Sequence, residues 1–192
     1  MVLVPLLLAI FWKVKTRLVI WLAALAALGG TYMLSTGGVS TKPSTGDLIV
    51  LAGSFVWAAH VIVVGLAVNK LDVFVFSVGQ FLLCGILHLV SSFFTAPPDI
   101  QNILISLPSV LYAGLASVVL GFTLQAVGQK HAPSADAALI LSLEAVFAAV
   151  FGALIIGERM NAIQILGCVI IMVSILRAQL IMLRSKNKMV DN

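Results

Sequence analysis

Long apolar runs separated by short polar stretches make up almost all of the 192-residue sequence. Six runs are long enough to cross a bilayer, since a helical span needs about 20 residues at a rise of about 1.5 Å per residue. They cover residues 18–34, 48–68, 73–94, 108–127, 135–156 and 162–183. A shorter run, residues 1–12, is interpreted as the second half of a helix. Because hydrocarbon offers no partner to a free backbone N–H or C=O, we predict that every run is helical.

This pattern predicts an all-α integral membrane protein, a transmembrane helix bundle of one partial and six full spans. Two of the polar stretches also carry helix-start signals. Ser44 with Asp47, and Asn161 with Gln164, have the spacing of a capping box, in which a polar cap residue is followed three positions later by an acid or amide. We therefore expect helices to begin at these two points.

Composition supports the membrane assignment and narrows the partners. Hydrophobic residues make up 61% of the chain and charged residues 9%. An ordinary soluble domain carries a much larger share of charged residues, roughly 25%. The expected partners are the lipid bilayer and a small-molecule substrate.

Other partners and cofactors are not expected. The basic residues do not cluster on a soluble face, so no nucleic acid partner is expected. The two cysteines lie inside apolar runs, and neither a metal-binding motif nor a phosphate-binding glycine loop is present in the sequence. We therefore expect no metal and no cofactor.

The distribution of Lys and Arg predicts the orientation. If the tail after Leu183 is cytoplasmic, nine of the 11 basic residues fall on the cytoplasmic side, as the positive-inside rule requires. We expect a multi-pass protein of the inner or plasma membrane with its C-terminus in the cytoplasm.

A weak internal repeat is present at an offset of 144 residues. Without gaps, Ala9 falls on Ala153 and Leu22 on Leu166, and the turn at Val14 falls on the turn at Glu158. The predicted topology places these two turns on opposite sides of the membrane. Such an inversion is typical of transporters built from inverted repeats, whose sites lie between the halves near the bilayer midplane.

Four segments resemble the EamA family of the drug/metabolite transporter superfamily. They are GDLIVLAGSFVWAAHVIVVG (46–65), QFLLCG (80–85), YAGLASVVLGFTLQAVGQKHAP (112–133) and LEAVFAAVFGALIIGERMNAIQILGC (143–168). The resemblance implies a fold of ten helices in two inverted five-helix repeats, and export of metabolites or drugs by proton exchange. It also implies that 46–184 is a complete second repeat, preceded by a linker at 37–45 and followed by a cytoplasmic tail at 185–192.

The segment VPLLLAIFWKVKTRLVIWLAALAALGGTYMLS (4–35) is similar to the last two helices of the first repeat in that family. Residues 1–36 are accordingly expected to be the remainder of a first repeat that lacks its first three helices. Two alternatives to a working transporter follow. The chain is a truncated, non-transporting membrane protein, or it forms a homodimer in which a second copy completes the pathway.

Polar side chains at one depth in different helices are the candidate site. Glu144, His60 and Gln80 lie seven to nine residues from the cytoplasmic end of their runs, a depth of roughly 11–14 Å in a helix. Trp57 and Ser117 are close to them in depth. A charge near the middle of a span is costly, so Glu144 is the leading candidate for a proton or substrate role, with His60 as its partner. The alternative is that these side chains only join neighbouring helices by hydrogen bonds.

Two further patterns are weaker. Glu158 and Arg159 form a polar corner between the last two runs and are interpreted as a corner salt bridge or cap, or as an external gate. His131 and Asp136 have the spacing of a membrane acyltransferase motif, but the residues around them are explained by a loop and a helix start. We therefore predict that the protein is not an enzyme.

Overall fold

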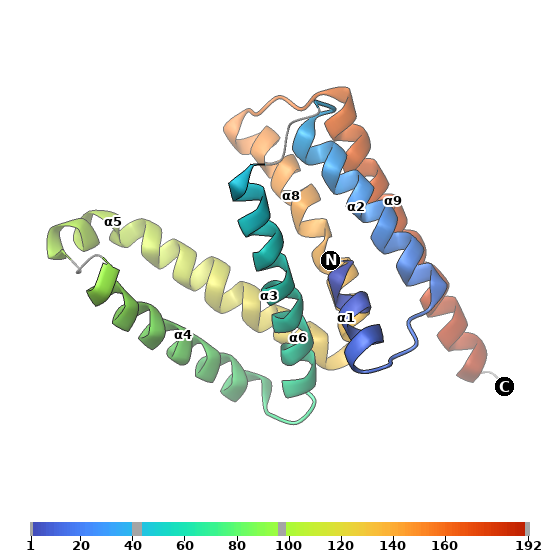
Figure 1. Cartoon of the computed structure of the whole chain (residues 1–192), viewed down its shortest axis with the longest axis horizontal. Helices are drawn as coiled ribbons and strands as arrows, with labels where there is room; N and C mark the ends of the chain where they lie inside the picture. The colour runs from blue at the N-terminus through green and yellow to red at the C-terminus, as the bar shows by residue number, and fades with distance from the viewer. Residues whose placement is uncertain (1, 40–43, 96–98, 191–192) are drawn as a thin grey trace. The chain divides into compact units, whose positions relative to one another are not determined.

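The part of the chain that the structure describes is mostly helical. The computed structural model describes residues 2–39, 44–95 and 99–190, with side chains as far as Arg184, and within these residues no strand is present (Figure 1). Six helices are long and apolar enough to cross a membrane: Leu18–Thr36, Thr45–Ala67, Val73–Thr95, Ile100–His131, Ser134–Ile156 and Ala162–Arg184. The predicted all-α membrane fold is confirmed. The predicted linker and tail include residues 40–43 and 191–192, which lie outside the described residues.

The chain forms two compact units. The first unit consists of Met1–Ile62 together with Pro133–Asn192, and the second of Val63–Ala132. The first contains α1 (Leu3–Phe11), α2 (Leu18–Thr36), most of α3 (Thr45–Ala67), α7 (Ser134–Leu141), α8 (Leu143–Phe151), the π-helical turn η2 (Gly152–Ile156) and α9 (Ala162–Val190). The second contains the end of α3, α4 (Val73–Thr95), α5 (Ile100–Tyr112), the π-helix η1 (Ala113–Phe122) and α6 (Thr123–His131).

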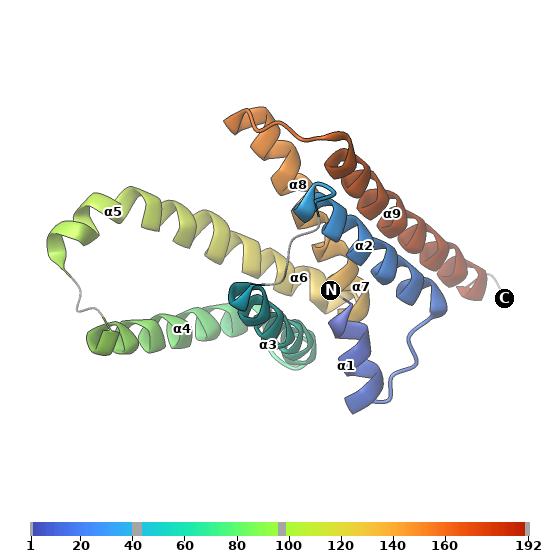
Figure 2. The same cartoon turned by 45° about the horizontal axis from the view of Figure 1, so that its top comes forward.

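In the first unit, α2 and α9 lie side by side and antiparallel (Figures 1 and 2). Two glycines allow this close approach. A Cβ atom on Gly30 would lie 2.7 Å from the Gly167 carbonyl oxygen, and a Cβ on Gly167 would lie 2.5 Å from the Gly30 carbonyl oxygen. Small residues let helix backbones approach closely in a membrane, where lipid removes the hydrophobic incentive to associate. The two backbones therefore touch at these glycines.

The start of α9 also caps the end of α2. The predicted capping box is present, because the Asn161 N–H donates to the Gln164 side chain and the Gln164 N–H donates to that of Asn161, both at 2.9 Å. The remaining amide donors of the two side chains reach α2, where Asn161 Nδ2 donates to the Gly37 carbonyl (2.9 Å) and Gln164 Nε2 to the Leu34 carbonyl (3.3 Å). The last carbonyls of a helix have no partner within it, so this contact satisfies two of them.

Three apolar clusters hold the first unit together. Ala23 and Ala24 of α2 pack with Leu139 of α7 and Ala178 of α9. The second cluster joins α1, α3 and α7, and the third joins α8 and α9 through Val146, Cys168, Ile171 and Ile175. Within the second unit, one cluster of buried residues joins the end of α3, the start of α4 and α6: Val64, Val68, Val73 and Ala126.

One predicted helix boundary was wrong and another was right. The capping box at Ser44 and Asp47 is confirmed, since the Ser44 N–H donates to the Asp47 carboxylate at 2.6 Å. The fourth span, however, begins at Ile100 and not near Pro108. Asp99 caps this helix by accepting from the Gln101 N–H at 3.2 Å, and Pro108 lies inside it. A proline removes one N–H donor, which a membrane helix tolerates when local adjustments satisfy the freed carbonyl.

The two turns related by the 144-residue offset have the same local geometry. The Val14 N–H donates to the Leu8 carbonyl at 3.2 Å, and the Glu158 N–H donates to the Gly152 carbonyl at 3.3 Å. The residue before each donor has a positive φ, 52° at Lys13 and 78° at Gly157. The following helices, α2 and α9, begin at positions 18 and 162, which differ by the same offset. Because these two helices are antiparallel, the geometry supports a repeat with inverted copies.

The α2–α9 contact predicts opposite effects for two neighbouring glycines. We expect Gly30→Ala to destabilise the protein by about 1–3 kcal/mol, because the added methyl group meets the Gly167 backbone. Gly29→Ala is the matched control, since nothing lies within 4 Å of the added Cβ. It is expected to be neutral or stabilising by up to about 1 kcal/mol. The measurement is the rate of thiol labelling at the buried Cys168 during thermal unfolding in detergent, in a Cys84→Ser background. Equal effects of the two substitutions would contradict this packing.

Candidate functional site

The fifth span, Ser134–Ile156, has a one-residue break in its α-helical hydrogen bonding near its middle, while its backbone stays helical there. The helix α7 ends at Leu141 and α8 begins at Leu143, and the buried Ser142 lies between them. The Ser142 hydroxyl donates to the Ala138 carbonyl at 3.1 Å, and its N–H donates to the Leu139 carbonyl three residues back at 3.0 Å. Serine hydroxyls that bond back to the preceding turn bend helices. The break was not predicted, although Ser142 is the polar residue closest to Glu144 within the run.

Glu144 lies directly after this break, in the first turn of α8. It is the eleventh of the 23 residues of the span, and its side chain is exposed. Its carboxylate forms no hydrogen bond or ion pair within the described part of the chain. The start of a helix carries partial positive charge, which favours a carboxylate in the first turn. The sequence prediction of a carboxylate at mid-span holds, but its side chain is not buried by the described residues.

His60 and Trp57 lie together on α3, in the first unit. Their rings are stacked, with centroids 5.3 Å apart and an angle of 30° between the planes. The neighbouring residues Ala58 and Val61 are buried and pack with Ala138 of α7. The stacked pair therefore belongs to a helix that is packed against the same broken span that carries Glu144. The His60 ring is half-buried, while Trp57 is 37% exposed.

Gln80 and Ser117 belong to the second unit. Gln80 is half-buried on α4, and Ser117 is exposed within the π-helix η1. Each π-helical turn shifts the side chains that follow it around the helix, and such turns are frequent at functional sites. That these two residues share a site with Glu144 and His60 stays a prediction.

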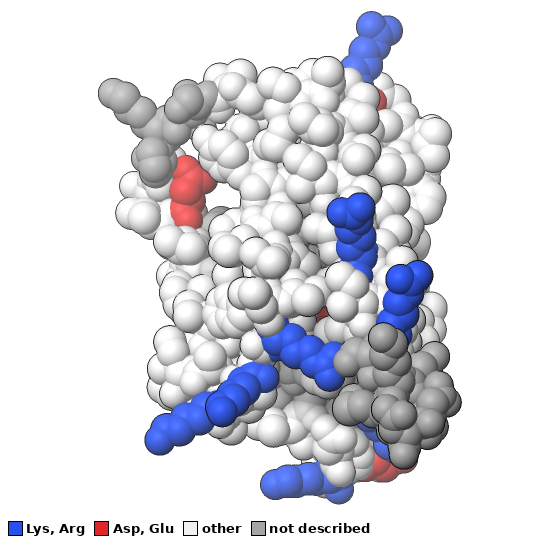
Figure 3. All heavy atoms as spheres, turned by 90° about the vertical axis from the view of Figure 1, so that its right-hand side faces the viewer, with Lys and Arg blue, Asp and Glu red and all other residues white. Residues whose placement is uncertain are grey.

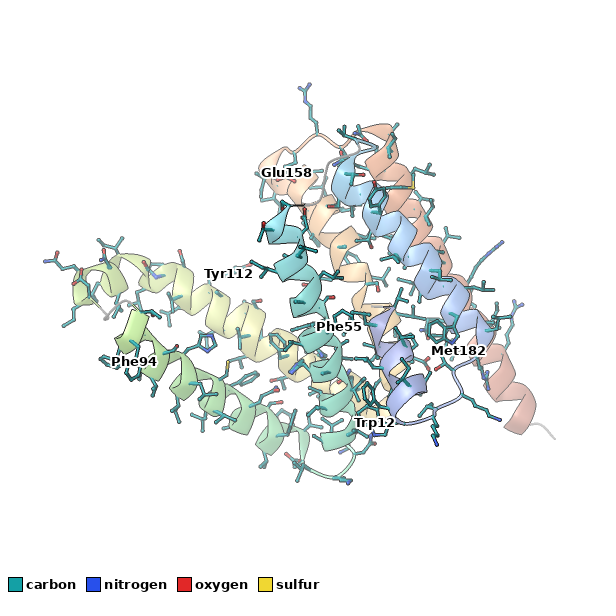
Figure 4. All side chains as sticks on the ribbon, viewed as in Figure 1. Trp12, Phe55, Phe94, Tyr112, Glu158 and Met182 are labelled. Carbon is teal, nitrogen blue, oxygen red and sulfur yellow. The ribbon has the colours of Figure 1, made fainter. Side chains whose placement is uncertain are left out.

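The corner that follows α8 is built around a left-handed glycine. Gly157 ends η2 with φ 78°, a conformation that favours glycine, and Glu158 comes next (Figure 4). The Glu158 carboxylate lies over the helix, because a Cβ added to Gly152 would be 2.7 Å from its Oε2 atom. Arg159 is exposed and forms no ion pair with Glu158 among the residues described. The corner thus places the carboxylate against η2, whereas the salt-bridge interpretation needs it beside Arg159.

No cluster of His, Cys, Asp and Glu suited to a metal ion is present in the described segments. The nearest approach to one is a pair on α4, where Cys84 Sγ lies 3.5 Å from His88 Nδ1. The same ring nitrogen lies 2.9 Å from the Cys84 carbonyl oxygen, so the imidazole is held by its own helix.

A comparison with protein families gives one match, and it agrees with the resemblance. A model of the EamA-like transporter family matches residues 44–178, which is more than half of the chain. None of the curated proteins and none of the solved structures matches the chain. The matched segment includes every candidate residue named above.

The stacked pair on α3 gives an optical test of proton binding at His60. A protonated imidazole on the face of an indole forms a cation–π contact and changes its emission. In a Trp12→Phe/Trp21→Phe background, which leaves Trp57 as the only tryptophan of the sequence, we expect its fluorescence to change as the pH is lowered and the imidazole takes up a proton. His60→Asn is expected to abolish this change. A titration that persists in His60→Asn would contradict the assignment.

Proposed function

Because the chain belongs to the EamA-like transporter family, we propose that it exports small metabolites or drugs by alternating access, coupled to protons. The family and the six apolar helices show a multi-pass membrane protein of drug/metabolite transporter type. We also propose the inner or plasma membrane as its location, with a cytoplasmic C-terminus, because most basic residues then lie in the cytoplasm.

The observation that carries the proposal is Glu144 beside the break at Ser142. A charged carboxylate at the centre of a span costs about 2.5–3.5 kcal/mol on insertion scales, so a protonated form is favoured whenever lipid or apolar protein surrounds it. The ionised form is favoured when water or a cation reaches the site. A group with two environments of this kind can take up a proton in one state of the transporter and release it in the other.

The broken span itself also supports transport. The Ser142 N–H bonds three residues back, as in a 3₁₀ turn, and such a turn inside a helix often marks a functional hinge. Here the first turn of α8 carries Glu144, and α7 packs against the helix that carries Trp57 and His60. We infer that the aromatic and imidazole rings line the same pathway and contact an amphipathic substrate. Glu158 and Arg159 are proposed as a gate at the far end of this span.

The test is proton movement in reconstituted vesicles. The purified chain is placed in vesicles that hold a pH-sensitive dye and is offered a panel of amino acids, nucleosides and amphipathic cations. We expect Glu144→Gln to reduce substrate-driven proton flux at least about tenfold, the equivalent of about 1.4 kcal/mol. The amide keeps the shape of the side chain but cannot exchange a proton.

Asp47→Asn is the matched control, because it removes an exposed carboxylate at the start of α3, keeps an oxygen that can accept from the Ser44 N–H, and leaves Glu144 in place. Its proton flux is expected to stay within about twofold of the unmodified chain. Proton flux that survives Glu144→Gln at its full rate would exclude Glu144 as the coupling residue. Substrate movement without any proton flux would exclude proton coupling itself.

A second candidate is that two copies of the chain complete one pathway. The exposed Glu144 favours it, since a carboxylate at mid-span normally faces protein or water and not lipid. The exposed residues Phe147, Ala148 and Phe151 continue from Glu144 along α8, with the two phenylalanine rings stacked at 6.5 Å. We call Glu144, Phe147, Ala148 and Phe151 the α8 stripe. In a dimer of this kind, the α8 stripe of one copy faces the α8 stripe of the other.

Cysteine cross-linking in membranes tests this arrangement. In a Cys84→Ser background, we expect Ala148→Cys to form a disulfide-linked dimer under mild oxidation, because the α8 stripes of two copies then lie side by side. The control is Leu28→Cys, an exposed mid-span position on α2, which is expected to remain monomeric. Absence of cross-linking at Ala148→Cys, or equal cross-linking at both positions, would contradict a symmetric α8 interface.

A further inference from the structure

One end of the α2–α9 pair is strongly basic. Figure 3 shows Lys and Arg side chains gathered over the end of this face where α9 finishes and α2 begins. Trp12 and Met182 lie at this end of the first unit, whereas Glu158 lies at the opposite end (Figure 4). Among the residues whose side chains are described, this end includes the basic residues Lys13, Lys15, Arg17, Arg177 and Arg184.

Arg177 differs from the others because it lies within a membrane span. The span Ala162–Arg184 ends seven residues later. Seven residues correspond to about 10 Å along a helix. The Arg177 side chain is exposed, and no described residue forms an ion pair with it. Ala178, the next residue, is buried against Ile20 and Ala23, so Arg177 lies beside the first turns of α2. An arginine at this depth needs an anionic or strongly polar partner.

Arg184 and the turn before α2 bring more positive charge to the same place. Residues seven apart share one face of a helix, so Arg184 lies below Arg177 on the exposed side of α9. Lys13 and Lys15 lie in the turn that precedes α2, and the first turn of α2 packs against Ala178 of α9 through Ile20. Arg17 differs, since it interacts electrostatically with Asp136 at the start of α7.

Apolar side chains accompany these charges. Ile181 lies between Arg177 and Arg184 on the same face of α9 and is 50% exposed, and Leu22 of α2 is 58% exposed. A cationic end that continues into an exposed apolar face matches a molecule with an anionic head and hydrocarbon tails. Neither a free phosphate ion nor a soluble anion uses the apolar part.

We propose that this end of the α2–α9 pair binds an anionic phospholipid. Arg177 and Arg184 hold its phosphate, Lys13 and Lys15 add positive charge around the headgroup, and the acyl chains lie against Leu22 and Ile181. Basic residues near the surface of an anionic leaflet contribute about 1 kcal/mol each, which is about fivefold in affinity. A zwitterionic lipid gains less from the same cluster because its headgroup carries no net charge. This site is independent of the transport proposal.

Lipid retention by the purified full chain tests the site. The chain in detergent is titrated with phosphatidylglycerol or with phosphatidylcholine, and bound lipid is counted by native mass spectrometry. We expect the unmodified chain to prefer phosphatidylglycerol and Arg177→Gln to weaken that binding about fivefold. Arg177→Lys keeps the charge and is expected to stay within about twofold. Arg159→Gln removes an exposed arginine at the opposite end and is expected to leave binding unchanged.

Three results of the lipid titration would contradict the proposed phospholipid site. Equal binding of both lipids by the unmodified chain would mean that Arg177 only extends to interfacial water. Equal losses in Arg177→Gln and Arg159→Gln would show a non-specific charge effect. Full displacement of phosphatidylglycerol by inorganic phosphate would show that the cluster binds phosphate without using the acyl chains. If Arg177→Gln does not fold, Arg184→Gln replaces it, with the same loss of about fivefold expected.

Discussion

Hydrocarbon offers no hydrogen-bond partner, and most features of this protein follow from that constraint. Every described backbone segment in the apolar part of the chain is helical, because only a helix satisfies its own N–H and C=O groups there. At two places within the first unit, a side chain supplies a hydrogen bond that the helix itself lacks. Ser142 does so at the break between α7 and α8, and Asn161 and Gln164 do so at the end of α2.

The same constraint makes a charged group within a span costly unless it has a polar partner. Glu144 and Arg177 are exposed on the described chain, and neither forms an ion pair there. Their surroundings must therefore supply what hydrocarbon does not. For Glu144, a proton or a polar pathway meets this need, which is the basis of the proposed function. For Arg177, a lipid phosphate meets it. One physical argument thus leads to two sites of different chemistry.

The spans could be predicted from the sequence because run length alone decides whether a helix crosses a bilayer. The start of the fourth span was predicted too late in the sequence. The polar residues Gln101 and Asn102 lower the hydropathy there, although Asp99 is a typical helix cap. The break at Ser142 was hidden for the opposite reason, because one serine barely changes the hydropathy of a long apolar run. Gly29 and Gly30 are equivalent in sequence, and only packing shows that Gly30 meets α9.

The candidate site stays a prediction. Depth along each helix identified Glu144 and His60, and the contact of Trp57 with His60 follows from their spacing of three residues on one helix. The exposure of Glu144 could not be predicted, because periodicity does not show which face of an almost wholly apolar helix meets its neighbours. The inverted repeat stays a prediction, which the shared geometry of the turns at Lys13 and Gly157 supports.

The central claim is that Glu144 is a membrane-embedded carboxyl group that exchanges a proton. Its most direct test is modification by dicyclohexylcarbodiimide, an apolar reagent that reacts with protonated carboxyl groups inside membranes. The account predicts modification at Glu144 that increases as the pH is lowered, with little at Glu158, which lies at the end of the span. The control is reaction of Glu158 with a water-soluble carbodiimide. If Glu158 reacts in this control and Glu144 stays unmodified by dicyclohexylcarbodiimide at every pH, the claim is contradicted.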